Sequence, residues 1–546
     1  MRKRSTCARW STPRGIKHVK ILPFVFLLCA AAVRAGLVPA SVFSDNMVLQ
    51  RDRPVPVWGT AAPEATVTVE FAGQSKTATA DPNGKWRVKL DALAASEEPR
   101  DFVLRVADTN SLVLTNVVVG EVWLCSGQSN MEWTVSKSAD YDATKADGDQ
   151  PLIRHFKVPR RDRAFPEQKI DAQWIICTPE TVGEFTAAGY SFARELEREL
   201  GVPVGLLNVS YGGTRIEPWA TPESLMEAAS LPELAARVRQ ASPLTPEGRT
   251  NYAAYLRSLE DWLPAAKSAV EQGVPFPVPP AEPWITGNEQ QPTRLYHGMV
   301  APTVPFAVRG VLWYQGEGNA GDAARYADKM AALVGGWREL WSDPQMPFYY
   351  VQLAGFQTSD PSKPEMGDGW ARLREEQLKA LSLPHSGMAV AIDIGETADI
   401  HPKNKQDVGR RLARWALART YGKDIVPSGP VYKNHSAGEG KVVVEFDHAD
   451  SGLFIGTKEG LKDPVPSADV GLPWISIAGV DKKFQWAEVS IDGPHLVVWN
   501  KEVPEPVAVR YGFTQNPEGA KLYNKDGLPA SPFRTDDWPA PEPETK

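Results

Sequence analysis

The segment Val122-Trp123-Leu124-Cys125-Ser126-Gly127-Gln128-Ser129-Asn130-Met131 gives the strongest indication of the fold. Its apolar first half has the length and composition of a buried β-strand, and a candidate nucleophile, Ser129, stands just beyond the end of that strand. Ligands of open α/β sheets bind beyond the carboxyl ends of the strands. The stretch therefore predicts an α/β sheet with Ser129 at its ligand-binding edge. Because Met131 stands where G-x-S-x-G requires glycine, the elbow of the α/β-hydrolases is not indicated.

The partners that a serine nucleophile needs are found far downstream, in Asp399-Ile400-His401. A serine hydroxyl is a weak nucleophile at neutral pH, so an imidazole has to accept its proton and a carboxylate has to hold that imidazole. In an extended segment, residues i and i+2 point to the same side roughly 7 Å apart, so one short loop can hold both groups. The loop follows an apolar, strand-like run at 387–394. We therefore predict a catalytic triad of Ser129, His401 and Asp399.

The periodicity of the chain changes on either side of residue 119. Residues 37 to 118 lack helical periodicity and consist of short strand-like runs separated by turns, which predicts a small β-sandwich. Beyond 119, strands and helices alternate, which predicts a parallel, doubly wound sheet. The helix patterns are at 180–200, 322–341 and 405–421, and the strand-like runs are at 204–209, 308–314, 348–353 and 388–394.

Residues 221–295 interrupt this alternation and are expected to be an insertion over the sheet. It contains helical pieces at 233–238 and 252–263, the second of which is expected to end at Pro264, and a proline-rich run at 274–280. Insertions of this size often form lids or substrate walls. The predicted domains are a signal peptide at 1–35, an N-terminal β-sandwich at 36–118, a catalytic domain at 119–424 and a C-terminal β region at 425–546.

The first 35 residues have the pattern of a secretory signal, with a basic start, an apolar core at 21–33 and a small-residue cleavage site before Gly36. The core is about 13 residues long, whereas a membrane-spanning helix needs ~20. A secreted or periplasmic protein without stable membrane association is therefore expected, and an uncleaved anchor is the alternative. The formal net charge of −7 is acidic, so nucleic acid is not an expected partner.

Cysteine and histidine usage leaves the redox state open and indicates no metal site. Cys7 and Cys29 fall in the signal segment, and Cys125 and Cys177 remain. An exported protein could pair these two, but two buried free thiols are equally compatible with the sequence. The eight histidines are scattered, and no Cys/His cluster has zinc spacing. No metal or other cofactor is expected.

Two further segments that follow predicted strands contain possible oxyanion donors. The glycine pair Gly212-Gly213 could bring backbone N–H groups close to a substrate oxygen. Gln315 and Asn319 offer side-chain amides, which are the other common donors. Either amide fits the role, and Gln315 is favoured because it directly follows its strand.

Four blocks of the sequence, taken in order, resemble those of the sialate O-acetylesterase family within the SGNH hydrolase superfamily. They are Gly127-Gln128-Ser129-Asn130-Met131, Tyr211-Gly212-Gly213-Thr214 with Ile216-Glu217 and Trp219, Trp313-Tyr314-Gln315-Gly316-Glu317 with Asn319-Ala320, and Asp399-Ile400-His401-Pro402 with Asn404-Lys405. The resemblance covers residues 37 to 535. It departs from the family at Gly318, where Ser is common, and at His297, where Asn is common. Neither departure touches the triad, but both could alter the substrate wall.

The resemblance implies a fold and a role for each matched residue. The fold would be an SGNH-hydrolase-like, flavodoxin-type parallel sheet flanked by helices, with a β-sandwich before it and a β region after it. Ser129 would be the nucleophile, and its N–H would form the oxyanion hole together with that of Gly212 or Gly213. The superfamily usually presents Asn as the third donor, so Gln315 and Asn319 both remain candidates. The substrate-binding residues would be Gln128, Arg215 and Glu317.

The expected function is that of a secreted serine esterase which removes O-acetyl groups from an acetylated carbohydrate, without a cofactor. A sialate is the substrate that the resemblance implies, and acetylated xylan or another polysaccharide is the alternative. Two alternatives come from other classes of protein. One is a sugar O-acetyltransferase that uses the same acyl-serine, and the other is a non-catalytic glycan-binding protein.

Overall fold

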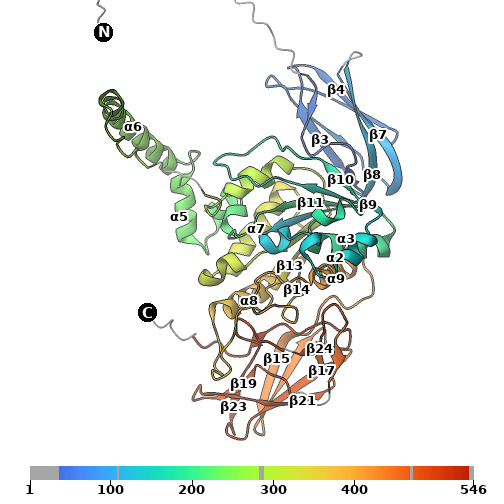
Figure 1. Ribbon diagram of the computed structural model, residues 1–546, viewed down its shortest axis with the longest axis vertical. Coiled ribbons are helices and arrows are strands. Elements are labelled where there is room, and N and C mark those ends of the chain that lie inside the picture. Colours follow the sequence, from blue (N-terminus) through green and yellow to red (C-terminus); the bar gives the residue numbers. More distant parts are fainter. Residues whose placement is uncertain (1–35, 107–109, 282–287, 468–470, 520, 540–546) are drawn as a thin grey trace, which may run out of the picture.

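The computed structural model describes residues 36–106, 110–281, 288–467, 471–519 and 521–539. The predicted signal peptide at 1–35 lies outside the described residues. An N-terminal β region, a central α/β body and a C-terminal β region follow one another along the long axis of the molecule (Figure 1). Within the described ranges, no helix has the length and apolar character that would let it span a membrane.

The N-terminal β region contains a three-stranded sheet and a second group of strands that is continuous with the central sheet. The three-stranded sheet contains β1 (Val38–Pro39), β3 (Val55–Thr60) and β6 (Lys85–Leu90), and the second group contains β4 (Thr66–Phe71), β5 (Gln74–Thr79), β7 (Ser96–Val106) and the start of β8 (Asn110–Gly127). Exposed and buried residues alternate along β6, so one face of its sheet lies in the core. The rings of Phe43, Phe71 and Phe102 pack in this core.

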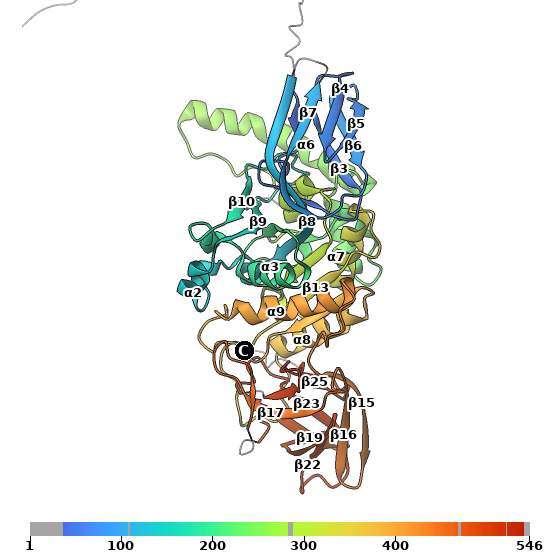
Figure 2. The same cartoon turned by 90° about the vertical axis from the view of Figure 1, so that its right-hand side faces the viewer.

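The strand β8 joins the N-terminal region to the body without a break (Figure 2). Its first half pairs with β7, and its second half pairs with β11 (Val204–Ser210) and β12 (Gly310–Tyr314). The boundary expected at 118 therefore falls inside a continuous strand. Gly120 stands where this strand passes another segment closely, because a Cβ there would lie 1.9 Å from the carbonyl oxygen of Pro203.

The central sheet places β8 at the point where the strand order reverses. The order is β10 (Trp174–Cys177), β9 (Gln150–Lys157), β11, β8, β12, β13 (Phe348–Gln352) and β14 (Ser386–Val390). In this spatial order, every strand from β9 onward runs parallel to its neighbours. The edge strand β10 runs antiparallel to β9, so the sheet is mixed rather than wholly parallel. A reversal of strand order opens a crevice at the carboxyl ends of the strands beside it.

Two pairs of helices pack in this body, α3 (Ala187–Leu200) with α9 (Lys405–Trp415), and α7 (Tyr326–Leu340) with α8 (Gly369–Lys379). The helix α9 begins where it was predicted, because the side chain of Asn404 accepts a hydrogen bond from the N–H of Asp407. The helices α3 and α7 begin later than predicted. Residues before α3 form a 3-10 turn, and Arg325 before α7 has a left-handed φ of 67°.

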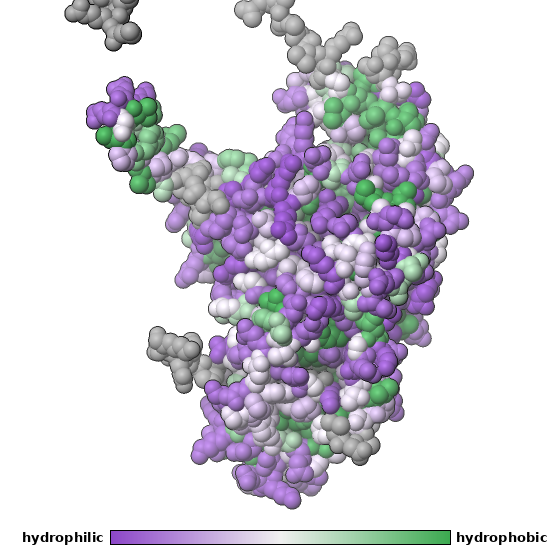
Figure 3. Space-filling view, viewed as in Figure 1, coloured by the Kyte–Doolittle hydropathy of each residue, from purple (hydrophilic) through white to green (hydrophobic). Residues whose placement is uncertain are grey.

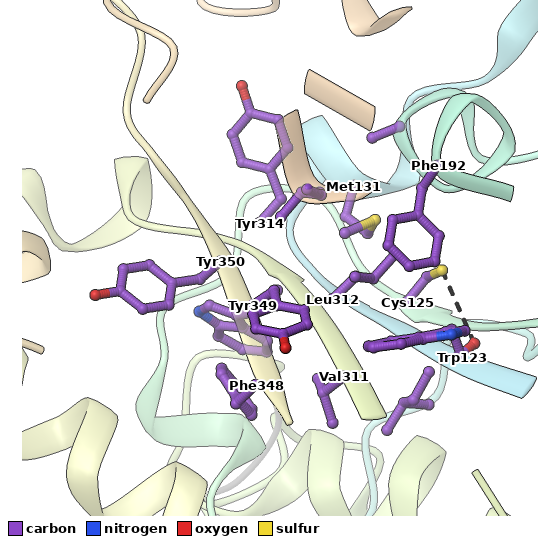
Figure 4. Packing of buried hydrophobic residues seen from close by; sticks show 14 of the residues in the cluster. Trp123, Cys125, Met131, Phe192, Val311, Leu312, Tyr314, Phe348, Tyr349 and Tyr350 are labelled. Carbon is purple, nitrogen blue, oxygen red and sulfur yellow. Dashed lines mark hydrogen bonds between the residues drawn. The ribbon is translucent and has the colours of Figure 1, made fainter. Parts of the chain in front are cut away.

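Large aromatic side chains fill the core beneath the carboxyl ends of the strands (Figure 4). Trp123 of β8 packs edge-on against Phe192 of α3 and stacks with Tyr349 of β13. Met131, two residues after the candidate nucleophile, is fully buried. Burial of each large apolar side chain stabilises a fold by roughly 1.5–3 kcal/mol, so the segment that carries Ser129 rests on a rigid base.

The insertion contains α4 (Pro222–Glu227), α5 (Pro232–Ala241) and α6 (Pro246–Gln272). The helix α6 runs through Pro264, so the expected end at that residue was wrong. Proline removes one backbone hydrogen bond from a helix, but Pro264 is exposed, where water can satisfy the freed carbonyl. The helix projects from the body (Figure 1), and this part of the insertion carries exposed apolar residues (Figure 3). They include Leu244, Leu256, Leu263, Val270, Phe276 and Val278.

The C-terminal β region forms three small sheets. The first sheet contains β15 (Val431–Gly438), β16 (Lys441–Asp447), β22 (His495–Trp499) and β21 (Glu488–Asp492). The second contains β18 (Val465–Pro466), β17 (Leu453–Thr457) and β24 (Leu522–Asn524). The third contains β20 (Phe484–Trp486), β19 (Ile475–Gly479), β23 (Pro506–Tyr511) and β25 (Phe533–Arg534). Hydrogen bonds connect this C-terminal region to the loop at 395–404. The Asn516 amide donates to Thr397 Oγ1 at 3.0 Å, and the Asn404 amide donates to the Gly460 carbonyl at 3.2 Å.

Cys125 and Cys177 are both free and buried, so the sequence alternative of a disulfide between them is not realised. Burial raises the pKa of both thiols, to about 12 for Cys177. They behave as small apolar core residues.

Candidate active site

Ser129 stands at the carboxyl end of the central strand, where the strand order reverses. It opens a single helical turn, α1 (Ser129–Glu132), immediately after β8. Gly127 ends that strand with a φ of 130°, and a Cβ there would lie 2.2 Å from the carbonyl oxygen of Tyr314. Only glycine meets both conditions, so the chain can turn sharply and present the Ser129 hydroxyl at the edge of the sheet.

The structure brings the three predicted triad residues together. His401 Nε2 lies 2.9 Å from Ser129 Oγ, and His401 Nδ1 lies 3.2 Å from Asp399 Oδ1. The backbone N–H of His401 donates to the same carboxylate oxygen at 2.9 Å. Burial lowers the pKa of His401, against the opposing effect of Asp399. The hydrogen bond from the His401 N–H lowers the pKa of Asp399, so this carboxylate stays ionised at neutral pH.

Trp133 fixes the plane of the histidine ring and was not anticipated from the sequence. Its ring stacks on the imidazole of His401, with centroids 4.8 Å apart and an interplanar angle of 16°. The tryptophan follows directly after α1, so the segment that supplies the nucleophile also supports the base. A tryptophan so close to a nucleophile motif is the only sequence signal that could have indicated this role.

The N–H of Gly212 is already bonded to the protein. It donates to Glu132 Oε2 at 2.9 Å, and Arg160 Nε holds the other oxygen of that carboxylate at 2.6 Å. Gly212 nevertheless lies next to the nucleophile, because a Cβ there would be 3.2 Å from the Cβ of Ser129. Among the described residues, the N–H groups of Ser129 and Gly213 have no protein acceptor. These two groups are therefore available as backbone donors beside the serine.

Gln315 lies beneath the site, fully buried and fully bonded, which differs from the expectation of a free oxyanion donor. Its Nε2 donates to Asn319 Oδ1 at 2.8 Å, to the Thr214 carbonyl at 3.1 Å and to Gln128 Oε1 at 3.2 Å. Its Oε1 accepts a hydrogen bond of 2.7 Å from Tyr326. The amide braces the loop that contains the glycine pair and leaves no donor for a substrate.

Asn319 is equally buried and has a similar bracing role. Its Nδ2 donates to both oxygens of Glu217, at 3.1 and 3.3 Å, and its Oδ1 accepts the N–H of Ile216 at 3.0 Å. The position of an amide at a strand end can be read from the sequence, but the direction of its side chain cannot. Here packing turns both amides inward.

We expect Gln315→Ala to act on stability more than on catalysis. The substitution leaves several buried polar groups without partners, and each such group costs about 1–3 kcal/mol. Urea unfolding should show this loss, while kcat of the folded protein changes less than tenfold. An unchanged unfolding midpoint with a hundredfold lower kcat would instead identify Gln315 as the third oxyanion donor.

Two of the three predicted substrate-binding residues are turned toward the protein. Gln128 is buried, and its Oε1 accepts the N–H of Gly318 at 3.0 Å. Glu317 directs its carboxylate inward to the amide of Asn130, and its Oε2 is buried without a hydrogen-bond partner among the described residues. Burial raises the pKa of Glu317. Both side chains shape the loops around Ser129 from below.

Arg215, by contrast, lies at an open cavity of about 820 Å³. Its guanidinium pairs with Glu217 at 3.2 Å and with Asp322, and its backbone N–H donates to Gln290 Oε1 at 3.1 Å. The amide of Gln290 in turn donates to the carbonyl of Gly213 at 2.9 Å. The wall of the cavity is thus bonded to the glycine pair beside the nucleophile. Across the described ranges, no group of three or more His, Cys, Asp or Glu residues is placed to hold a metal ion.

Comparisons with known proteins find carbohydrate esterases similar to this chain. A family model described as carbohydrate esterase, sialic acid-specific acetylesterase, matches residues 119–242 and 281–418. The sialate O-acetylesterase of Mus musculus is 30% identical over an alignment of 458 positions, and the match covers 76% of this chain and 80% of the relative. The sialate O-acetylesterase of Homo sapiens is 26% identical and matches 94% of this chain and 95% of its own length.

A solved structure is similar over nearly the whole chain. The crystal structure of a carbohydrate acetylesterase from Xanthomonas citri is 38% identical, with a TM-score of 0.75, and the match covers 92% of this chain and all of that chain. The two segments matched by the family model leave out residues 243–280, which contain α6. The projecting helix therefore lies outside the part of the chain that the family model describes.

Proposed function

The chain belongs to the sialate O-acetylesterase family of carbohydrate esterases, and on this basis we propose that it is a serine esterase which removes O-acetyl groups from sugars. The single observation that carries the serine mechanism is the hydrogen-bonded series from Ser129 Oγ through His401 to Asp399, with separations of 2.9 and 3.2 Å. An esterase needs no other side chains to form and release an acyl-enzyme.

In the proposed mechanism, neutral His401 takes the proton of Ser129 through Nε2 as the hydroxyl attacks the acetyl carbonyl. Asp399 holds the Nδ1 hydrogen and stabilises the imidazolium that forms. His401 then protonates the departing sugar oxygen, which leaves an acetyl group on Ser129. Water activated by the same imidazole releases acetate and restores the serine.

We assign the oxyanion hole to the free N–H groups of Ser129 and Gly213, which can bind the negative charge of the tetrahedral intermediate. Gly212 joins them only if the Glu132 carboxylate moves away from its N–H. Arg215 is the predicted substrate-binding residue that a sugar can reach, because it lines the open cavity.

We further propose that the body is an SGNH-hydrolase-like domain at 119–424. The order β11-β8-β12-β13-β14 corresponds to the 2-1-3-4-5 order of flavodoxin-type sheets. The N-terminal β-sandwich at 36–118 and the C-terminal β region at 425–546 flank it, with the continuous strand β8 crossing the first boundary. The signal-like pattern at 1–35 supports a secreted or periplasmic location.

The rate should depend on pH through His401. Only neutral imidazole acts as the base, and burial lowers the pKa of His401 below its ordinary value of 6.5. We therefore expect kcat/KM on an aryl acetate to rise with pH, with a midpoint below 6.5, and then to stay level. Rates measured from about pH 4 to pH 8 test this. A midpoint above the ordinary value, or no acidic limb at all, would count against a histidine base in this environment.

The preferred sugar is tested by measuring acetate release from a panel of acetylated sialosides, xylo-oligosaccharides and pectic fragments. The family favours a sialate, and an acetylated xylan or another polysaccharide is the alternative with the same mechanism. A preference of at least tenfold in kcat/KM for one class would identify the substrate. If no member of the panel nor an aryl acetate releases acetate, the proposed function is wrong.

Two other classes of function are less well supported. An O-acetyltransferase has to keep water away from its acyl-serine, but the side chains of His401 and Asp399 are 25% and 36% exposed, which favours hydrolysis. A non-catalytic glycan-binding protein has no use for a serine hydroxyl in hydrogen-bond contact with a histidine.

A further inference from the structure

A buried ammonium group lies beside the triad, and the ester-hydrolysis steps do not use it. Lys405 is the first residue of α9, and no part of its side chain is exposed. Its Nζ donates to the Pro402 carbonyl and to Asn130 Oδ1, both at 2.6 Å. It also lies 5.7 Å from the ring centroid of Trp133 and 5.5 Å from that of Tyr314. Moving a charged group out of water costs free energy, so the burial of the Lys405 ammonium needs an explanation.

Asn130 is the residue through which this ammonium can act on the triad. Its Nδ2 donates to the carbonyl of Ile400 at 3.1 Å and to the carboxylate of Glu317. Asn130 directly follows the nucleophile, and Ile400 directly precedes the histidine. One amide, oriented by Lys405 on its oxygen side, therefore connects the loops that follow β8, β12 and β14.

The charges around Lys405 and His401 come from several elements. Glu317 faces Lys405 from the segment after β12, and Asp399 and Glu396 face it from the histidine loop. Lys405 and Lys137, the latter in the turn η1 (Val135–Lys137), lower the pKa of His401, while Asp399 raises it. Burial lowers the pKa of Lys405 to about 7, against the opposing effect of the three carboxylates. On the acidic side of neutrality Lys405 is therefore charged.

We propose that Lys405 is a positioning residue which, through Asn130, holds the loop of Ser129 against the loop of His401. It touches neither the substrate nor the reacting atoms. Its bond to Asn130 Oδ1 orients the amide so that Nδ2 reaches the Ile400 carbonyl, and this sets the separation of Ser129 Oγ and His401 Nε2. Its charge also disfavours the imidazolium form of His401 in the free enzyme. The inference rests on the proposed serine mechanism.

The test is the substitution Lys405→Met, which keeps an unbranched side chain one atom shorter than lysine and removes the ammonium. Small misplacements of reacting groups cost about a hundredfold in rate, so we expect the plateau kcat on an aryl acetate to fall at least about tenfold. KM should change less than about twofold, because the substrate contacts are untouched. The pKa of His401 should rise when a neighbouring positive charge is lost, which moves the acidic limb of kcat/KM to higher pH.

A second variant keeps the test decisive if Lys405→Met fails to fold. The double variant Lys405→Met with Glu317→Gln removes both buried ionisable groups, so the Glu317 carboxylate is not left buried without a positive charge near it. It should unfold at a higher temperature than Lys405→Met and still show the loss of kcat and the raised pKa of His401. The matched control is Lys137→Met, which removes another positive charge near the Trp133 ring but has no bond to Asn130. It should leave the plateau kcat unchanged.

Histidine ring NMR separates this inference from the proposed function, because it reports the pKa of His401 without turnover, with His401→Gln used to assign the signal. If the wild type hydrolyses no acetate ester, the proposed function fails, and the NMR titration alone decides the inference. The inference is overturned if the folded single or double variant shows no rise in the pKa of His401. It is equally overturned if an active wild type loses less than tenfold in plateau kcat on this substitution.

Discussion

Replacing Ser129 with alanine is expected to abolish acetate release while leaving the fold intact. The hydroxyl makes a single side-chain contact in the described structure, the 2.9 Å hydrogen bond to His401. Its loss therefore removes the nucleophile and little else. Removing the nucleophile of a serine hydrolase costs on the order of 10⁶ in kcat. Acetate release from an aryl acetate, together with the thermal unfolding midpoint, measures both halves of this expectation.

Ser126→Ala is the matched control. Ser126 lies on β8, three residues before Ser129, and its fully buried hydroxyl donates to the Val209 carbonyl at 2.6 Å. We expect this control to lose about 1 kcal/mol of stability and to keep its activity. If Ser129→Ala retains activity within tenfold of the wild type, Ser129 is not the nucleophile, and the serine mechanism has to be abandoned.

The second large effect is expected for Asp399→Asn, which should lower kcat by roughly 10⁴. Asp399 Oδ1 accepts hydrogen bonds from both the backbone and the ring of His401. An asparagine amide presents its own N–H to Nδ1, so it favours the tautomer that leaves Nε2 protonated and unable to accept the serine proton. The substitution also removes the charge that stabilises the imidazolium. Steady-state kinetics on the plateau of the pH profile measure the loss.

Asp393→Asn is the control for a nearby carboxylate. Asp393 is held by the two terminal guanidinium nitrogens of Arg411, at 2.7 and 2.8 Å, and has no hydrogen bond to His401 in the described structure. Breaking this buried pair should cost about 3–5 kcal/mol in stability and leave kcat of the folded protein unchanged. If Asp399→Asn keeps its kcat within tenfold, another carboxylate orients the histidine. Asp393 or Glu317 would then have to leave its present partner.

The sheet could be predicted because each strand of it is a short, nearly continuous apolar run. The runs at 204–209, 308–314 and 348–353 correspond to β11, β12 and β13 within a few residues. Parallel strands buried on both faces need such composition, and the helix between two of them needs a periodicity of 3.6. The prediction was wrong where a local sequence rule about helix ends did not hold in the folded protein. Pro264 usually ends a helix, but α6 continues because the affected turn faces solvent.

The local sequence pointed to Ser129, His401 and Asp399, the three residues that the structure brings together. Ser129 had to follow a buried strand, and Asp399 and His401 had to share one loop two residues apart. These requirements concern residue type and local spacing, and both can be read from the sequence without knowledge of the tertiary packing.

The hydrogen-bond partners of the groups around these three residues depend on tertiary packing. Each buried donor takes whichever acceptor lies within reach, and that choice is made between segments far apart in the chain. The Gly212 N–H thus bonds Glu132, and the amide of Gln315 is used up by Thr214 and Asn319. Lys405 reaches Asn130 across 275 residues of sequence. No local pattern encodes these pairings, because they arise when the ends of β8, β12 and β14 are packed side by side.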